Sequence, residues 1–541
     1  MPLSAARVRS SFLAKLGLAV VLVWLGDWLF YQRTFYGGYI GIYALALLAA
    51  LVAGNRAVRQ DRRAWTAVAA AVVFAGALIY DTSLLAWCLF WIGATIAVLI
   101  PATVRFGDGW QWFQRVAWQG LRSPFAPLID LKRVSIARRR RGRSRFGLRA
   151  ALPVIALPLT GSVVILVLFA AANPVLERFL SSATVPEPSM LDVFRLIVWI
   201  ALFATAWGLL RARLASYILP TFDGRGELPL PGVSVASVLL SLIAFNALFA
   251  LQNLLDIAYF SGLAAMPQDM TMAQYAHRGA YPLIVTALLA AAFVLVTLRP
   301  GSATAAIPAI RRLVVLWIGQ NLLLVAFSIQ RTLDYVQSYS LTELRIAALG
   351  WMGLVAFGLV AICWRMLRDR SAGWLINVNM AAAALLLTLA SFIDLGAVVA
   401  AWNVRYAREA HGPGVELDLC YLDSLGDSAL LPLIALEQRT DLEPAFRERV
   451  QAVRERRLRE LQRALQHGRW TVVRQRRLEV ARAELGSVPG MPLDPGYREC
   501  NGLLEQPPGL EDYISPTDLY TPAASGETPA PAATLTAEKG K

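Results

Sequence analysis

Residues 233–257, VSVASVLLSLIAFNALFALQNLLDI, decide the fold of this 541-residue chain. A helix needs about 20 mostly apolar residues to cross about 30 Å of hydrocarbon, and this run is long enough. Its amide and carboxyl side chains are Asn246, Gln252, Asn253 and Asp256. At about 100° per residue, these four fall within about 120° of one another. The stretch therefore predicts a transmembrane helix with a single polar face.

Similar apolar runs recur along the whole chain. Hydrophobic residues make up 57% of it and charged residues 16%, against about 45–50% and about 25% in soluble domains. This composition excludes a secreted disulfide scaffold, a fibrous protein and a largely disordered chain. We predict an all-α, polytopic transmembrane helix bundle with a helical hydrophilic C-terminal tail. Its spans number about eleven and lie near residues 12–31, 36–54, 65–80, 84–101, 151–172, 193–211, 233–257, 281–298, 312–329, 345–366 and 374–397.

The arginines indicate how these spans are oriented. Positively charged loops are retained in the cytoplasm, and the basic loops alternate with loops that are poor in arginine. The N-terminus is therefore expected in the cytoplasm, and an odd number of spans places the C-terminal tail outside. One miscounted span would reverse the tail, and the arginines between residues 447 and 463 fit that alternative. Pairing of Cys420 with Cys500, which needs an oxidising compartment, would fit the external tail.

Composition divides the chain into five segments. Beyond residue 400 it becomes hydrophilic, and apolar residues recur at helical spacing between 443 and 485. The last residues are rich in Pro, Ala, Thr, Ser and Glu, which is typical of disorder. The expected segments are an N-terminal four-span segment (1–101), a basic aromatic cytoplasmic loop (102–150), a seven-span core (151–400), a hydrophilic helical tail (401–514) and a disordered C-terminus (515–541).

The long loop 102–150 combines aromatic and basic residues. Each basic side chain near an anionic leaflet contributes about 1 kcal/mol, and an aromatic helix in the interface would anchor the loop. We therefore predict contact with the bilayer and its anionic headgroups. The net charge of +15 does not indicate a nucleic-acid partner. Many of the arginines that produce it lie in the loops that set the orientation of the spans, so we predict that the protein binds no nucleic acid. The predicted membrane-surface residues are Trp110, Trp112, Trp118, Arg138, Arg139, Arg140 and Arg141.

Ionisable groups inside a membrane are costly, so Asp27, Asp256 and Asp394 each require an explanation. A second polar stripe, Gln320, Asn321 and Ser328, leads into the next loop. Both stripes fit either hydrogen bonding between helices or a wet binding site. For the second reading, the residues of the candidate polar face are Asn246, Asn253, Asp256, Tyr275, His277, Arg278, Arg331, Asp334, Tyr335, Arg345, Asp394, Asn403 and Arg405.

Catalytic patterns are missing from the sequence. It contains no nucleophile arrangement, no metal triad and no glycine loop of the kind that cradles phosphates. We therefore predict no catalytic residue, no metal and no cofactor, and an enzyme is the less favoured class.

Several ordered motifs resemble a known family. They are MPQDMTMAQYAHRGAYPL at 266–283, YVQSYSLTELR at 335–345 with Ser340 in place of the usual glycine, Asp394 followed by WNVRY at 402–406, and LDLCYLDSL at 417–425. Together they resemble a bacterial polytopic inner-membrane family known only as a domain of unknown function, number 4173, over roughly residues 150–480. The resemblance implies a multi-pass protein of the bacterial inner membrane and supplies no activity.

Three function classes fit these observations. The first is a membrane protein that binds or translocates a small polar or amphipathic solute without ATP hydrolysis, with the acids as proton-coupling groups. The second is a signalling or scaffold protein that recruits a protein partner through its tail. The third is an external-facing enzyme that acts on a lipid-linked substrate.

Overall fold

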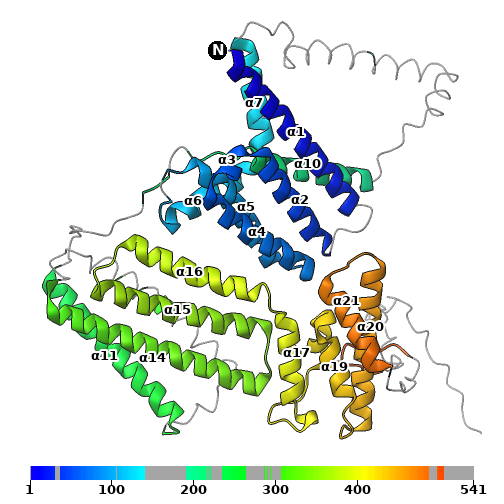
Figure 1. Cartoon of the computed structure of the whole chain (residues 1–541). Coiled ribbons are helices and arrows are strands. Elements are labelled where there is room, and N and C mark those ends of the chain that lie inside the picture. Colours follow the sequence, from blue (N-terminus) through cyan, green and yellow to red (C-terminus); the bar gives the residue numbers. More distant parts are fainter. Residues whose placement is uncertain are drawn as a thin grey trace, which may run out of the picture.

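The computed structural model describes eight stretches of the chain and five single residues between them. The stretches are 2–30, 37–104, 106–140, 190–215, 218–220, 234–263, 306–486 and 496–504, and the single residues are 162, 285, 286, 289 and 293. Helices dominate these residues, in which the one β-type pairing is an isolated bridge between Arg498 and Leu504. The predicted all-α polytopic bundle is therefore confirmed. Figure 1 shows an N-terminal bundle, a group of four long helices and a C-terminal helical unit.

The N-terminal bundle has an apolar core of small residues. Alanine supplies many of its buried positions, among them Ala71, Ala75 and Ala94, which lets the helix backbones approach closely. Asp27 ties α1 to α10, because its carboxylate receives hydrogen bonds from Arg195 Nε at 2.7 Å and from Trp199 Nε1 at 2.8 Å. The bundle contains α1 (Pro2–Phe30), α2 (Tyr39–Gly54), α3 (Arg56–Gln60), α4 (Arg62–Tyr80), α5 (Leu84–Leu99), α6 (Gly109–Arg122), α7 (Ala126–Arg140) and α10 (Met190–Leu210).

The four long helices begin at clear N-terminal signals. The hydroxyls of Ser234, Thr342 and Ser371 accept hydrogen bonds from backbone N–H groups in the first turns of α11, α15 and α16. Pro308 is the first residue of α14. Proline has no N–H group, and at this position an N–H would have no partner within the helix. The four helices are α11 (Val235–Phe260), α14 (Pro308–Tyr339), α15 (Glu343–Leu367) and α16 (Ala372–Ala390).

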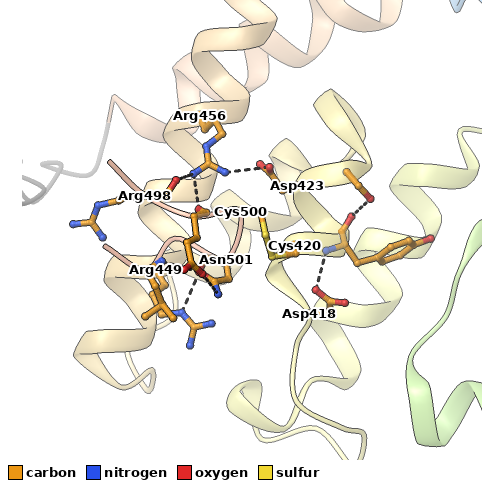
Figure 2. The surroundings of a disulfide bond; sticks show 12 residues. Asp418, Cys420, Asp423, Arg449, Arg456, Arg498, Cys500 and Asn501 are labelled. Atoms are coloured by element: carbon orange, nitrogen blue, oxygen red, sulfur yellow. Dashed lines mark hydrogen bonds and ion pairs between the residues drawn. A yellow bond between two sulfur atoms is a disulfide. The ribbon is translucent and has the colours of Figure 1, made fainter. Parts of the chain in front are cut away.

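The C-terminal unit has its own apolar core. Val450 and Val453 are fully buried there, as the helical spacing of these residues predicts. A disulfide joins Cys420 to Cys500 across 80 residues, and beside it Arg456 bonds Asp423 and the carbonyl oxygens of Arg498 and Glu499 (Figure 2). The unit comprises α17 (Leu395–Tyr406), α18 (Leu419–Ser424), α19 (Leu430–Glu437), α20 (Pro444–Gln466) and α21 (Val472–Leu485).

The chain is a multi-pass membrane protein. Among the described residues, eight helices are long and apolar enough to cross a membrane, and α2 is a shorter apolar helix. These nine correspond to nine of the expected spans. The other two, 151–172 and 281–298, lie outside the described residues except for 162, 285, 286, 289 and 293, and the C-terminus 515–541 lies outside them entirely.

The C-terminal ends of two spans differ from the prediction by seven residues or more. Helix α14 continues to Tyr339 rather than 329, because Arg331 finds a carboxylate partner within the bundle. Helix α16 ends at Ala390 rather than 397, because Asp394 caps the next helix by accepting a hydrogen bond from the backbone N–H of Ala397 at 3.0 Å.

The C-terminal unit docks on one end of the membrane helices (Figure 1). The backbone N–H of Gly38 donates to the carbonyl oxygen of Trp470 at 2.5 Å. Gly37 has φ +133°, and a Cβ there would lie 2.7 Å from that same oxygen, so this contact requires glycine. At the other side, the hydroxyl of Tyr421 accepts a hydrogen bond from the N–H of Glu343 at 3.2 Å. The unit therefore covers loops at the arginine-poor end of the bundle.

Candidate functional site

Helices α11 and α14 meet along a polar seam. Asn246 Nδ2 donates to the carbonyl oxygen of Leu313 at 3.1 Å, and Asn253 Nδ2 donates to that of Gln320 at 3.3 Å. Donors and acceptors both advance by seven residues, so the two helices run parallel and stay in register over two turns. We call this contact the α11–α14 seam.

A buried ion pair lies at one end of the seam. Asp256 is 4% exposed and Arg331 is 8% exposed, and Asp256 Oδ1 accepts a hydrogen bond from the Arg331 guanidinium. Gln252 Nε2 donates to the same oxygen at 3.2 Å. Each charge offsets the desolvation penalty that the other would meet alone in a low-dielectric interior.

Three acceptor oxygens of the seam find no hydrogen-bond donor among the described residues, namely Gln320 Oε1, Asn253 Oδ1 and Asp256 Oδ2. Gln320 Nε2 donates to Asn246 Oδ1 at 3.2 Å, which holds this side chain near the level of Asn246. With a rise of about 1.5 Å per residue, the distance along the helix axis from Asn246 past Asn253 to Asp256 is about 15 Å. A buried acceptor without a donor costs about 1–3 kcal/mol. The seam can therefore accept hydrogen bonds from a group that carries donors.

Arg345 belongs to a separate group at the α14–α15 turn. Its guanidinium donates to the carbonyl oxygen of Tyr339 at 2.7 Å and to that of Ser340, and its Cζ lies 4.2 Å from the ring centre of Tyr335. Ser340 has φ +66°, a conformation that favours glycine. Arg345 thus holds a strained turn together.

Asp394 belongs to a third group, in the C-terminal unit. Arg477 pairs with Asp394, and its Nη1 lies 2.6 Å from Asp427 Oδ2. Ser428 Oγ also donates to Asp394 Oδ1 at 3.0 Å. Burial raises the pKa of Asp427, with Arg474 acting in the opposite direction, and burial lowers the pKa of Arg477. This cluster fastens α21 to the start of α17.

The remaining residues of the candidate face have various positions. Asn403 is buried and binds Leu341 twice, accepting from its N–H at 2.8 Å and donating to its carbonyl oxygen at 2.9 Å. Asp334 accepts a hydrogen bond from Gln330 Nε2 at 2.9 Å, and Arg405 is exposed. Tyr275, His277 and Arg278 lie outside the described residues. The described contacts thus divide the candidate face into three groups.

The predicted membrane-surface residues lie on two helices. In α6, Trp118 is 52% exposed, whereas Trp112 is 5% exposed and packs in the N-terminal core. Trp110 is half-buried and stacks on Phe113. Arg138, Arg139 and Arg140 fall in the last turn of α7, where the side chains are outside the described part, as is Arg141.

One basic residue of α1, Lys15, is not among the residues predicted from the sequence. Lys15 lies within a span and donates to Asn55 Oδ1 at 2.6 Å and to the carbonyl oxygen of Leu210 at 2.7 Å. An ionisable group within a membrane span requires an explanation, so the position of Lys15 is itself a sequence signal for a polar contact.

The described stretches contain no group of three or more His, Cys, Asp or Glu residues that could hold a metal ion.

The chain belongs to the family described as "Domain of unknown function (DUF4153)", which matches residues 67–436. The expected type, an uncharacterised family, is correct, but the expected number 4173 is not matched. No curated protein and no solved structure matches the chain.

Proposed function

We propose that this membrane protein binds a small polar solute that carries hydrogen-bond donors, along the α11–α14 seam. The observation that carries the proposal is a series of buried acceptors that have no donor among the described residues, Gln320 Oε1, Asn253 Oδ1 and Asp256 Oδ2. All three are oxygens, so they would complement a donor and repel an acceptor. An amine or ammonium group fits this set best, because it offers several N–H donors and a positive charge for Asp256.

Arg331 would act as the resident counter-ion of the site. In the absence of solute it pairs with Asp256 Oδ1 and keeps the carboxylate neutralised. A cationic solute at Asp256 Oδ2 would share this carboxylate with the guanidinium. A group that binds charge in this way within a membrane is typical of a solute or proton pathway, so translocation without ATP hydrolysis is the activity that we propose for the bound solute.

Thermal unfolding of the purified protein in detergent tests the proposal. The probes are ammonium, spermidine, glucosamine and lysine, and tryptophan fluorescence reports the midpoint. A solute at 100 times its dissociation constant stabilises the folded state by about 2.7 kcal/mol. We expect at least one probe to raise the midpoint of the native protein and not that of Asp256→Asn.

Asp334→Asn is the matched control, since it neutralises a carboxyl group on α14 that accepts a hydrogen bond only from its own helix among the described contacts. It should respond like the native protein. Equal midpoint shifts in Asp256→Asn and the native protein, or no shift with any probe, would overturn the proposal.

We also propose that the N-terminus is cytoplasmic, that the membrane is the bacterial inner membrane, and that the C-terminal unit lies outside. The disulfide between Cys420 and Cys500 supports this orientation, because disulfides persist in oxidising compartments. The docking of the unit on the arginine-poor loops gives independent support, because those loops are the ones exported under the positive-inside rule.

A membrane-impermeant thiol reagent applied to intact cells tests the orientation. After reduction with an impermeant reductant, Cys420 and Cys500 should be labelled, and without reduction they should not. Variants with Cys88→Ala and Cys363→Ala remove the two other cysteines and make the signal specific. Labelling that appears only after lysis would place the unit inside.

A further inference from the structure

A cavity of about 700 Å³ opens between the middle of α1, at the start of its membrane span, and the C-terminal end of α2 with the following helix α3. Small residues create the space, since a Cβ on Gly17 would meet no atom within 4 Å. The described lining is Ala14, Lys15, Gly17, Leu18, Val21, Ala53, Gly54, Asn55, Arg56, Ala57 and Arg59. Its volume is within the range of ordinary small-molecule sites, about 300–1,000 Å³. We call it the α1–α2 pocket.

The polar side of the α1–α2 pocket offers donors and positive charge. Its charged residues are Lys15, Arg56 and Arg59, and its described lining contains no acid. The Lys15 ammonium is held by two neutral acceptors, Asn55 Oδ1 and the carbonyl oxygen of Leu210. These bonds fix the position of the charge, and no carboxylate pairs with it among the described contacts. The site is therefore electrostatically incomplete and would be completed by an anion.

An orphan donor in the same pocket supports this reading independently. The Nδ2 atom of Asn55 is buried and has no hydrogen-bond partner within the described part of the chain, while its Oδ1 accepts a hydrogen bond from Lys15. A buried donor without an acceptor is costly. An anionic oxygen beside Lys15 and Asn55 would satisfy both the donor and the charge.

The other side of the pocket is apolar and continues onto the membrane surface of α1. Leu18 and Val21 line it, and Val21 is 56% exposed within the span Phe12–Phe30. Lys15 lies near the start of the span Phe12–Phe30, and Arg56 and Arg59 follow the end of α2 in the short helix α3. Such span ends are where lipid headgroups meet water. A ligand with an anionic head and a hydrocarbon chain matches both sides, whereas free phosphate matches only one.

We propose that the α1–α2 pocket binds the phosphate group of an anionic phospholipid, with one acyl chain against Leu18 and Val21. Lys15 and Asn55 Nδ2 contact the phosphate oxygens, and Arg56 and Arg59 supply long-range attraction. This site is distinct from the solute seam of α11 and α14 and does not depend on it.

Native mass spectrometry of the full-length protein in detergent tests the lipid site, with phosphatidylglycerol and phosphatidylcholine as matched probes. Each basic side chain near an anionic surface contributes about five-fold in affinity. We expect phosphatidylglycerol to remain bound in preference to phosphatidylcholine, and Arg56→Gln/Arg59→Gln to weaken this binding by about 30-fold. The control Arg62→Gln/Arg312→Gln removes the same charge from exposed positions outside the pocket and should leave the preference unchanged.

A second variant guards against misfolding. Asn55→Asp replaces the neutral acceptor of Lys15 with a carboxylate, which neutralises the pocket and keeps an acceptor for the ammonium. It should unfold at a normal temperature and lose the preference for phosphatidylglycerol. Equal binding of both lipids by the native protein, or an unchanged preference in Asn55→Asp, would overturn the proposal. Displacement of the lipid by millimolar inorganic phosphate would instead identify a free-anion site and refute the lipid assignment.

Discussion

The α4–α5 hairpin and the α11–α14 pair join their helices by opposite means. All eight buried residues of α4 are apolar, and Gly93 of α5 packs against Ala71 so closely that an added Cβ would lie 3.3 Å from the alanine methyl group. In α11, three of the five buried residues are Asn246, Asn253 and Asp256. One pair is held by close packing and the other by hydrogen bonds and an ion pair.

This difference shows where the bundle keeps buried polar groups at a cost in stability. Lipid is as apolar as leucine, so membrane helices associate through close packing and through polar contacts. Close packing alone suffices for α4 and α5. The α11–α14 seam instead keeps a buried ion pair and unpartnered acceptors that apolar residues would avoid, which is why we place the function there.

The largest expected effect breaks the ion pair of the seam. Arg331→Met leaves Asp256 buried without its counter-ion and should lower the free energy of unfolding by about 3–5 kcal/mol. Denaturant unfolding in detergent, followed by tryptophan fluorescence, measures the change. The double variant Asp256→Leu/Arg331→Met should recover most of the loss, because it removes both charges. A single variant as stable as the native protein would show that the pair is not buried.

The next effect tests close packing in the hairpin. Gly93→Val forces extra atoms against Ala71 and should destabilise the protein by about 1–3 kcal/mol. Gly76→Val in α4 is the matched control, because a Cβ there meets no atom within 4 Å. The same unfolding measurement applies. Equal losses at both glycines would mean that the effect comes from the helix backbone and not from packing between α4 and α5.

The smallest effect concerns the asparagine bonds of the seam. Asn246→Leu removes two hydrogen bonds between the helices, one to Leu313 and one from Gln320, and at about 0.6 kcal/mol for each it should cost about 1.2 kcal/mol. Asn379→Leu is the control, since the Asn379 amide donates to Leu375 within its own helix. A loss above about 2 kcal/mol for Asn246→Leu would show that the amides, and not the ion pair, hold the seam.

Local sequence signals predicted the helices well. Nine described helices coincide with predicted spans, and the spacing of Val450 and Val453 correctly indicated a helix with a buried face. The polar face of residues 233–257 was visible because helical periodicity is a local property. Chain length, hydropathy and periodicity therefore suffice for the elements and for the face that each one presents.

The partners of these faces could not be derived in the same way. Asp256 meets Arg331, 75 residues later, and Asp394 meets Arg477, which is not one of the four arginines of the candidate face. Such pairings depend on how helices distant in sequence are placed side by side, which periodicity within one helix does not specify.

The sequence by itself determined that this chain is a helical membrane protein with an alternating charge pattern and a polar stripe on one helix, because bilayer thickness and helical periodicity act on each segment separately. Only the tertiary structure decided that the polar groups form three groups instead of one face. It also decided that the C-terminal unit covers the arginine-poor end and that Lys15 and Asn55 share a pocket. These features depend on register and docking between segments far apart in the chain.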